Sequence, residues 1–133
     1  MGSTLAVLSA VAALTVGGSG GLIVGPGPVT RAVDRGIYHL ELGIAPNKGG
    51  LIRNEFTVRV TRAGRPVHGD LLVRFTMRAM PMQSLALRLR ETAPGRYEGG
   101  FKLRMIGEWE IRFHVTPKGA RPFDVVLLDR VRI

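Results

Sequence analysis

Apolar and polar residues alternate with a period of two through most of the chain beyond residue 37. Phe56, Val58 and Val60 alternate with polar side chains, and the same pattern recurs in residues 73–78, 85–90 and 109–115. A strand with one face on a core and the other in water has this period, whereas an amphipathic helix repeats about every 3.6 residues. Turn-forming residues separate the runs at 63–66, 93–95, 105–107 and 117–119.

Short strands at regular spacing, with no helical period between them, are typical of an antiparallel β-sandwich. We therefore expect an all-β domain with an immunoglobulin-like sandwich of about seven strands. The expected strands cover residues 37–44, 53–62, 67–78, 84–91, 96–104, 108–116 and 122–132.

The first 30 residues form a different kind of segment, because they contain no charged side chain. The apolar run 4–24 would reach about 30 Å as a helix, the thickness of a bilayer's hydrocarbon core. A cleaved signal peptide is the alternative, but no Lys or Arg precedes the run and its small-residue triplet at 10–12 lies early for cleavage. We favour one N-terminal transmembrane helix with a Gly/Pro linker over residues 1–30, followed by an extracytoplasmic sandwich domain over 31–133.

Small residues recur every four positions through this apolar run. Such spacing places them on one face of a helix, where they allow another transmembrane helix to approach closely. The alternative is coincidence in a segment rich in Gly and Ala. The predicted helix-packing residues are Ser9, Ala13, Gly17, Gly21 and Gly25.

The charge of the chain is strongly positive, at +9, and Arg outnumbers Lys by 16 to 3. Many arginines fall on the polar positions of expected strands. They form either a solvated face or a surface that docks an acidic partner or anionic head groups. Nucleic acid is disfavoured because no aromatic and basic platform is evident. The predicted docking residues are Arg59, Arg74, Arg88, Arg90 and Arg112.

Several motifs occur in an order that resembles the FixH/YtkA-like family of small extracytoplasmic β-sandwich domains. They are Gly-Arg-Pro-Val at 64–67, Met-Pro-Met at 80–82, Pro-Gly-Arg-Tyr at 94–97 and Met-Ile-Gly-Glu-Trp at 105–109. The resemblance covers roughly residues 37–116. It implies a bacterial protein with a membrane helix or signal peptide before the sandwich. It also implies copper handling or an accessory role around a membrane redox complex.

Thioether sulfurs are soft ligands that select Cu(I), so a copper role would depend on methionines. Met80 and Met82 share parity around a proline, and Met105 would join them if the two loops lie at one end of the sandwich. Nothing in the sequence brings His68 or His114 close to them. The alternative is that these methionines fill gaps in packing, as expected for a core-facing residue such as Met77.

The topology relative to the membrane rests on two opposing indications. Arg31 and Arg35 follow the apolar run, which by the positive-inside rule would place the sandwich in the cytoplasm. Asp34 offsets this small bias, and the family resemblance implies export. We expect a single-pass protein of the bacterial cytoplasmic membrane with its C-terminal domain in the periplasm.

No catalytic constellation is evident. Ser84 is the one serine beyond residue 30 and has no nucleophile-elbow pattern, and Glu108 and Glu110 are expected to pair with neighbouring arginines. The absence of cysteine excludes disulfides and thiolate sites. We expect a non-catalytic accessory subunit, without a cofactor, that binds a larger membrane redox or photosynthetic complex. The alternative is a periplasmic Cu(I)-binding or copper-delivery domain using Met80, Met82 and Met105.

Overall fold

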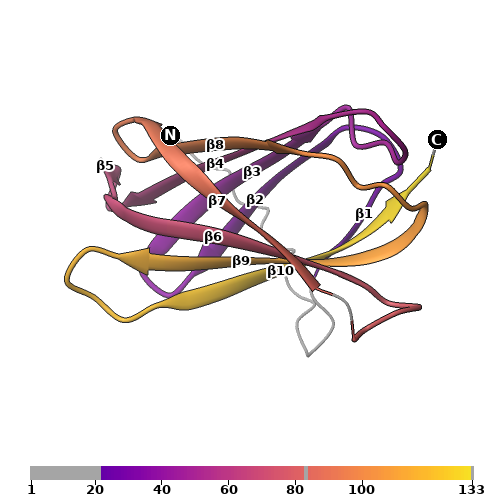
Figure 1. Ribbon diagram of the computed structural model, residues 1–133. Helices are drawn as coiled ribbons and strands as arrows, with labels where there is room; N and C mark the ends of the chain where they lie inside the picture. Colours follow the sequence, from indigo (N-terminus) through magenta and orange to yellow (C-terminus); the bar gives the residue numbers. More distant parts are fainter. Residues whose placement is uncertain (1–21, 83, 133) are drawn as a thin grey trace.

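The chain folds as an all-β sandwich in a computed structural model that describes residues 22–82 and 84–132 (Figure 1). Over these two ranges there are ten strands, and no helix long and apolar enough to cross a membrane. The strands are β1 (Leu22–Val24), β2 (Val29–Arg35), β3 (Tyr38–Ala45), β4 (Asn54–Arg62), β5 (Arg65–Pro66), β6 (Gly69–Met77), β7 (Ser84–Ala93), β8 (Arg96–Phe101), β9 (Gly107–Pro117) and β10 (Phe123–Val131).

The strands form two layers that β7 joins. The hydrogen-bonded order is β1-β10-β9-β6-β7-β8-β4-β3-β2, with β5 attached to β4. The first part of β7 pairs with β6 and its last part with β8, and Figure 1 shows its diagonal course between the layers. We call β1, β10, β9 and β6 layer A, and β8, β4, β3 and β2 layer B. Among the described pairs, β1 with β10 is parallel and the others are antiparallel.

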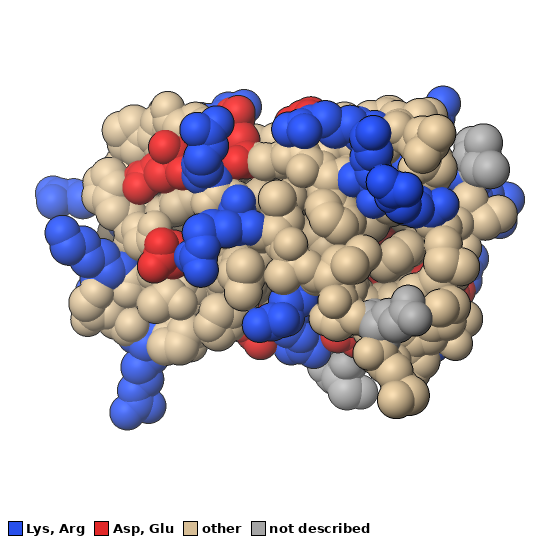
Figure 2. Space-filling view, viewed as in Figure 1, with Lys and Arg blue, Asp and Glu red and all other residues tan. Residues whose placement is uncertain are grey.

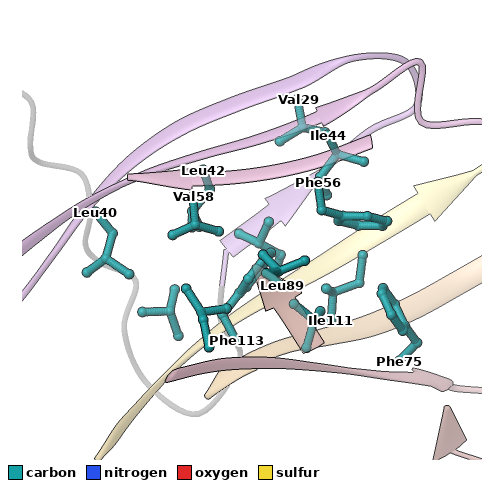
Figure 3. Packing of buried hydrophobic residues seen from close by; sticks show 14 of the residues in the cluster. Val29, Leu40, Leu42, Ile44, Phe56, Val58, Phe75, Leu89, Ile111 and Phe113 are labelled. Atoms are coloured by element: carbon teal, nitrogen blue, oxygen red, sulfur yellow. The ribbon is translucent and has the colours of Figure 1, made fainter. Parts of the chain in front are cut away.

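The inward side chains of both layers meet in one hydrophobic core (Figure 3). Phe75 of β6 has no exposed surface, stacks on Phe101 at 4.5 Å between ring centroids, and meets the edge of Phe56 at 5.1 Å. Ile111 and Phe113 of β9 are also fully buried. Every second residue of these strands points inward, so the period-two pattern of the sequence becomes the core.

All seven expected strands are present, with ends within three residues of the expected ones. The expected count is too low, because β1, β2 and β5 are additional. β1 and β5 are three and two residues long, too short to show a period. Most of β2 is exposed at the edge of layer B, so its sequence lacks a continuous apolar face.

The described residues begin inside the segment predicted to form the membrane helix. Residues 22–24, the last three of the predicted membrane helix, form a strand that pairs with residues 127–129 of β10. Val24 is buried in the core. β-Branched residues such as valine pack well on the pleated surface of a sheet, which favours a strand here. β2 begins at Val29, two residues before the predicted start of the sandwich domain at residue 31.

Gly25 is the one member of the predicted helix-packing stripe that lies in the described ranges. Gly25 follows β1 with a φ of +78°, a left-handed conformation that does not continue a helix. A Cβ there would overlap Asp129 Oδ1, so the backbone lies directly against β10. The prediction for Ser9, Ala13, Gly17 and Gly21 concerns residues outside the described ranges.

The inward phase predicted for β7 holds for only part of the strand. Leu89 is 3% exposed, whereas Leu85, expected in the core, is 48% exposed. β7 begins at one end of layer A and crosses to layer B, so its first residues lie where the two layers separate. The layers do not cover this part of the strand.

Candidate functional site

A pocket of about 550 Å³ opens at one end of the sandwich, beside the start of β7. Three of the connections at this end contribute residues to the pocket or its rim, namely residues 46–53, 78–83 and 102–106, and the β1–β2 connection lies at the same end. We call this the loop end. Gly50 N–H donates to Leu103 O at 2.9 Å, and Arg78 N–H donates to Glu108 O at 2.9 Å, so the connections are tied to one another and to β9.

The lining of the pocket combines apolar side chains with cations. Arg53, Lys102 and Arg104 contribute positive charge, and none of the described residues that line it is acidic. Such a lining favours an apolar or anionic group and disfavours a cation. The apolar walls come from Met77, Met80, Leu85, Phe101, Met105 and Trp109.

The inner wall of the pocket depends on how β9 begins. Trp109 lies directly opposite Met77 in the β6–β9 pair, and its Nε1–H donates to Met105 O at 2.9 Å. Gly107 has a φ of +138°, and a Cβ there would lie 2.8 Å from Met77 Cε. Glycine at this position therefore allows the Met77 side chain to pack against the start of β9.

The structure brings together part of the predicted methionine set. Met80 and Met105 line the same pocket, as expected if their loops share one end of the sandwich. Met82 does not line it and is 97% exposed, so sequence parity around Pro81 does not make the two side chains neighbours. Met77 packs against the core, as expected, and also forms part of the pocket wall.

The histidines lie elsewhere, each beside a carboxylate. The Nδ1 atom of His39 lies 2.7 Å from Asp34, that of His68 lies 2.6 Å from Glu91, and that of His114 lies 2.6 Å from Asp124. In the described part of the chain, no group of three or more His, Cys, Asp or Glu residues could hold a metal ion. A metal in the pocket would therefore depend on thioether ligands.

The five predicted docking arginines do not form one surface. Arg74, Arg88 and Arg112 lie on the outer face of layer A, where Arg74 is directly opposite Arg112 on β9. Arg59 lies on the outer face of layer B, opposite Arg96, and Arg90 lies where β7 crosses between the layers. Period-two alternation shows that a residue points outward but not from which layer, so one patch could not be derived from sequence.

On layer A, Arg112 is neutralised and Arg74 is not. Arg112 lies 3.1 Å from both Glu110 and Asp124, and the hydrogen bond with Asp124 is the main reason that its pKa is raised. Burial acts to raise the pKa of Asp124, but bonds from His114 and Arg112 outweigh it and lower that pKa. Arg74 has no ion pair with any residue that the structure describes. Its charge faces solvent uncompensated.

A buried polar pair beside β1 was not predicted from the sequence. Asn47 Nδ2 donates to Asp129 Oδ1 at 2.8 Å and to Gly27 O at 2.9 Å, and neither Asn47 nor Asp129 is exposed. Burial raises the pKa of Asp129. The signal was present, because Asp129 shares parity with the core residues Leu127 and Val131. This pair attaches the segment after β1 to the sandwich.

The pocket also contains side chains that sequence reasoning did not select. Leu85 and Trp109 lie in alternating runs that were expected to face the core, whereas Phe101 and the three cations of the lining were not singled out. Each lies at a strand end or in a connection that carries Met, Leu or Ile together with Lys or Arg. Apolar and basic residues side by side in these connections were the available signal for a pocket. The signal can be interpreted only when it is known which connections lie next to one another.

Comparison with protein families agrees with the motifs and the fold. A family model described as YtkA-like matches residues 44–114, which run from the end of β3 to β9. The match includes the β6–β7 and β8–β9 connections and every residue that lines the pocket. Comparison with curated proteins finds no match, and comparison with solved structures finds none. The chain belongs to the YtkA-like family.

Proposed function

We propose that the chain is a non-catalytic accessory subunit of a membrane redox or photosynthetic complex, anchored in the bacterial cytoplasmic membrane with its sandwich in the periplasm. Membership of the YtkA-like family supports a small accessory domain. The charge-free first 30 residues support a membrane anchor. The outer face of layer A is the surface that would meet the complex.

The cross-strand pair of Arg74 and Arg112 carries this proposal. Like charges directly opposite each other on adjacent strands are destabilising, so the pair needs compensation. Glu110 and Asp124 both compensate Arg112, which leaves the charge of Arg74 available to an acidic group outside the domain. Arg88 lies two strand positions away on β7 and is a second cation on this face. It is paired with the exposed Asp70, at 3.5 Å. An acidic periplasmic surface of a partner would complement this face.

The test is co-purification of the full chain with membrane proteins in a mild detergent. Arg74→Glu should lower the amount of bound complex about tenfold, because it introduces repulsion at the centre of the face. Arg59→Glu is the matched control, since Arg59 is also exposed and opposite an arginine but lies on layer B. Equal losses for both variants, or recovery of the wild type as an isolated processed monomer, would contradict the proposal.

The anchor can be tested in the same experiment. Gly17→Leu combined with Gly21→Leu should weaken the association if this helix packs on partner helices, since larger side chains keep backbones apart. An unchanged yield would show that the contact depends on the sandwich alone.

Cu(I) binding is a second candidate, favoured by the three methionines that line one pocket. Met77, Met80 and Met105 offer the thioether donors that Cu(I) prefers. The cations in the lining act against a positive ion, which is why this candidate ranks second.

Competition with a chromophoric Cu(I) chelator would measure copper binding to the full chain. Met80→Leu and Met105→Leu should each reduce binding strongly, and the exposed Met82→Leu is the matched control that should not. A wild type that takes no Cu(I) from the chelator, or a loss as large in Met82→Leu, would exclude a copper site in this pocket.

A further inference from the structure

Large apolar side chains are exposed mainly at the loop end. Nine large hydrophobic residues are exposed in the described ranges, and seven of them lie in or beside the three connections there. Met82 is 97% exposed and Leu51 is 74% exposed. Contiguous exposed apolar groups usually mark a surface that contacts another apolar phase. The seven residues are Leu51, Ile52, Met80, Met82, Leu85, Met105 and Ile106.

The same connections carry positive charge and no negative charge. Residues 46–53, 78–83 and 102–106 contain no Asp or Glu. Arg53 is paired with Glu55 at 2.6 Å and Arg78 lies 3.7 Å from Glu108, both acids being on strands. In Figure 2 the broadest group of Lys and Arg side chains lies toward the right, the end where the β8–β9 connection is drawn in Figure 1. The five cations are Lys48, Arg53, Arg78, Lys102 and Arg104.

The opposite end of the sandwich shows that charge alone does not distinguish the loop end. Its connections also contain cations, including Lys118 and Arg121, and no acid. Among the described residues, the connections of the opposite end expose one large apolar side chain, that of Ile37, which is 60% exposed. The loop end therefore differs from the opposite end in combining apolar tips with the cations.

We propose that the loop end docks on the anionic surface of a phospholipid bilayer. Aliphatic loop tips among cations match an interface in which apolar side chains enter the acyl region and Lys and Arg reach the phosphates. A protein interface would be expected to have fewer charges at its centre and more aromatic side chains, whereas none of the seven exposed residues is aromatic. A bilayer also lies within reach, because the sequence predicts a membrane segment within residues 1–30.

This docking goes beyond the proposed function, since the complex would meet layer A and the lipid would meet the loop end. The domain would stand with its loop end on the membrane and present the face containing Arg74 sideways. The pocket, which lies at this end, would then be close to the head groups, where the cations of its lining suit phosphate. Loss of lipid docking and loss of the complex are therefore separable by variants.

The absence of cysteine allows a direct test with a single environment-sensitive fluorophore. Leu51→Cys is labelled in the full chain, and Ile37→Cys at the opposite end is the matched control. Both chains are placed in bilayer discs of phosphatidylcholine, alone or with about one quarter phosphatidylglycerol. We expect a blue shift and a several-fold rise in emission for the Leu51→Cys label when phosphatidylglycerol is present, and little change for the control.

A second variant tests the role of charge. Lys102→Glu with Arg104→Glu, in the labelled Leu51→Cys chain, should abolish the response to phosphatidylglycerol while leaving co-purification with the complex unchanged. The two labels responding alike, or neither responding, would overturn the proposal. It would also be overturned by a Leu51→Cys label that responds only when partner membrane proteins are added, because the loop end would then be a protein-binding surface.

Discussion

Replacing Asp129 with asparagine should stabilise the fold near neutral pH. Asn47 Oδ1 and Asp129 Oδ2 are both buried without a hydrogen-bond partner when the acid is ionised. Protonation of Asp129 turns Oδ2 into a hydrogen-bond donor, which is the kind of group that the unpartnered acceptor Asn47 Oδ1 requires. Burial favours this neutral form and raises the pKa of Asp129 above its ordinary 3.8. The amide of asparagine offers the same donor and acceptor pattern at every pH.

The sign and size of the pH effect follow from linkage. Because the folded pKa is raised, the stabilisation by Asp129 is complete below pH 3.8, the ordinary pKa value, and is lost as pH rises through the folded pKa. The loss is at most about 1.4 kcal/mol per pH unit for one proton. The asparagine variant should match the wild type at acid pH, exceed it increasingly between pH 3.8 and the folded pKa of Asp129, and keep a constant advantage above that pKa. Asp129→Ala should instead cost about 1–3 kcal/mol, because it leaves Asn47 without its partner.

Urea unfolding followed by fluorescence would measure this difference, since Trp109 is the only tryptophan and is buried. When the unfolding free energy of the wild type is subtracted from that of the variant at each pH, the contributions of the other carboxyl groups cancel. Asp124→Asn is the control with the opposite sign, because the pKa of Asp124 is lowered and its stabilisation is lost as pH falls. A pH-independent difference for Asp129→Asn, or a variant less stable than the wild type at neutral pH, would refute the reasoning.

Three further changes test the core, the Tyr97 hydroxyl and the N-terminal turn. Phe75→Ala should destabilise the fold by about 3–5 kcal/mol, since a fully buried aromatic ring is removed; urea unfolding measures it. Tyr97→Phe should cost about 1 kcal/mol, because the hydroxyl donates to Val67 O at 2.7 Å. In the wild type, burial raises the Tyr97 pKa to about 12, so the variant should lose the upper step of an ultraviolet pH titration. Gly25→Ala should cost roughly 2–4 kcal/mol, because φ is positive and a Cβ would overlap Asp129; the thermal midpoint should fall, and an unchanged midpoint would contradict the close approach.

Regular strands in the middle of the chain could be predicted because their signal is local. Phe56, Val58 and Val60 point to the core since alternate residues of any strand share a face. The same reasoning failed at the edges. Leu85 has the correct phase, but its end of β7 lies beyond the cover of both layers, which no local pattern records.

The candidate sites were predicted less well because they depend on which strands are neighbours. Met80 and Met105 could be proposed as neighbours only on the assumption that their loops share an end. Arg59 and Arg74 look alike in sequence, yet they face opposite sides of the sandwich.

The sequence by itself determined the all-β class, the seven main strands, the family motifs and the separation of charge from the first 30 residues. These features depend on composition and on residues a few positions apart. The tertiary structure decided the layer of each arginine, the pocket lining, the addition of β1 to β10 and the burial of Asn47 against Asp129. Such contacts join residues that are distant in sequence, as between Leu22 and Leu127 or between Asn47 and Asp129. Strand order sets them, and hydrophobic alternation is the same for any order of the strands.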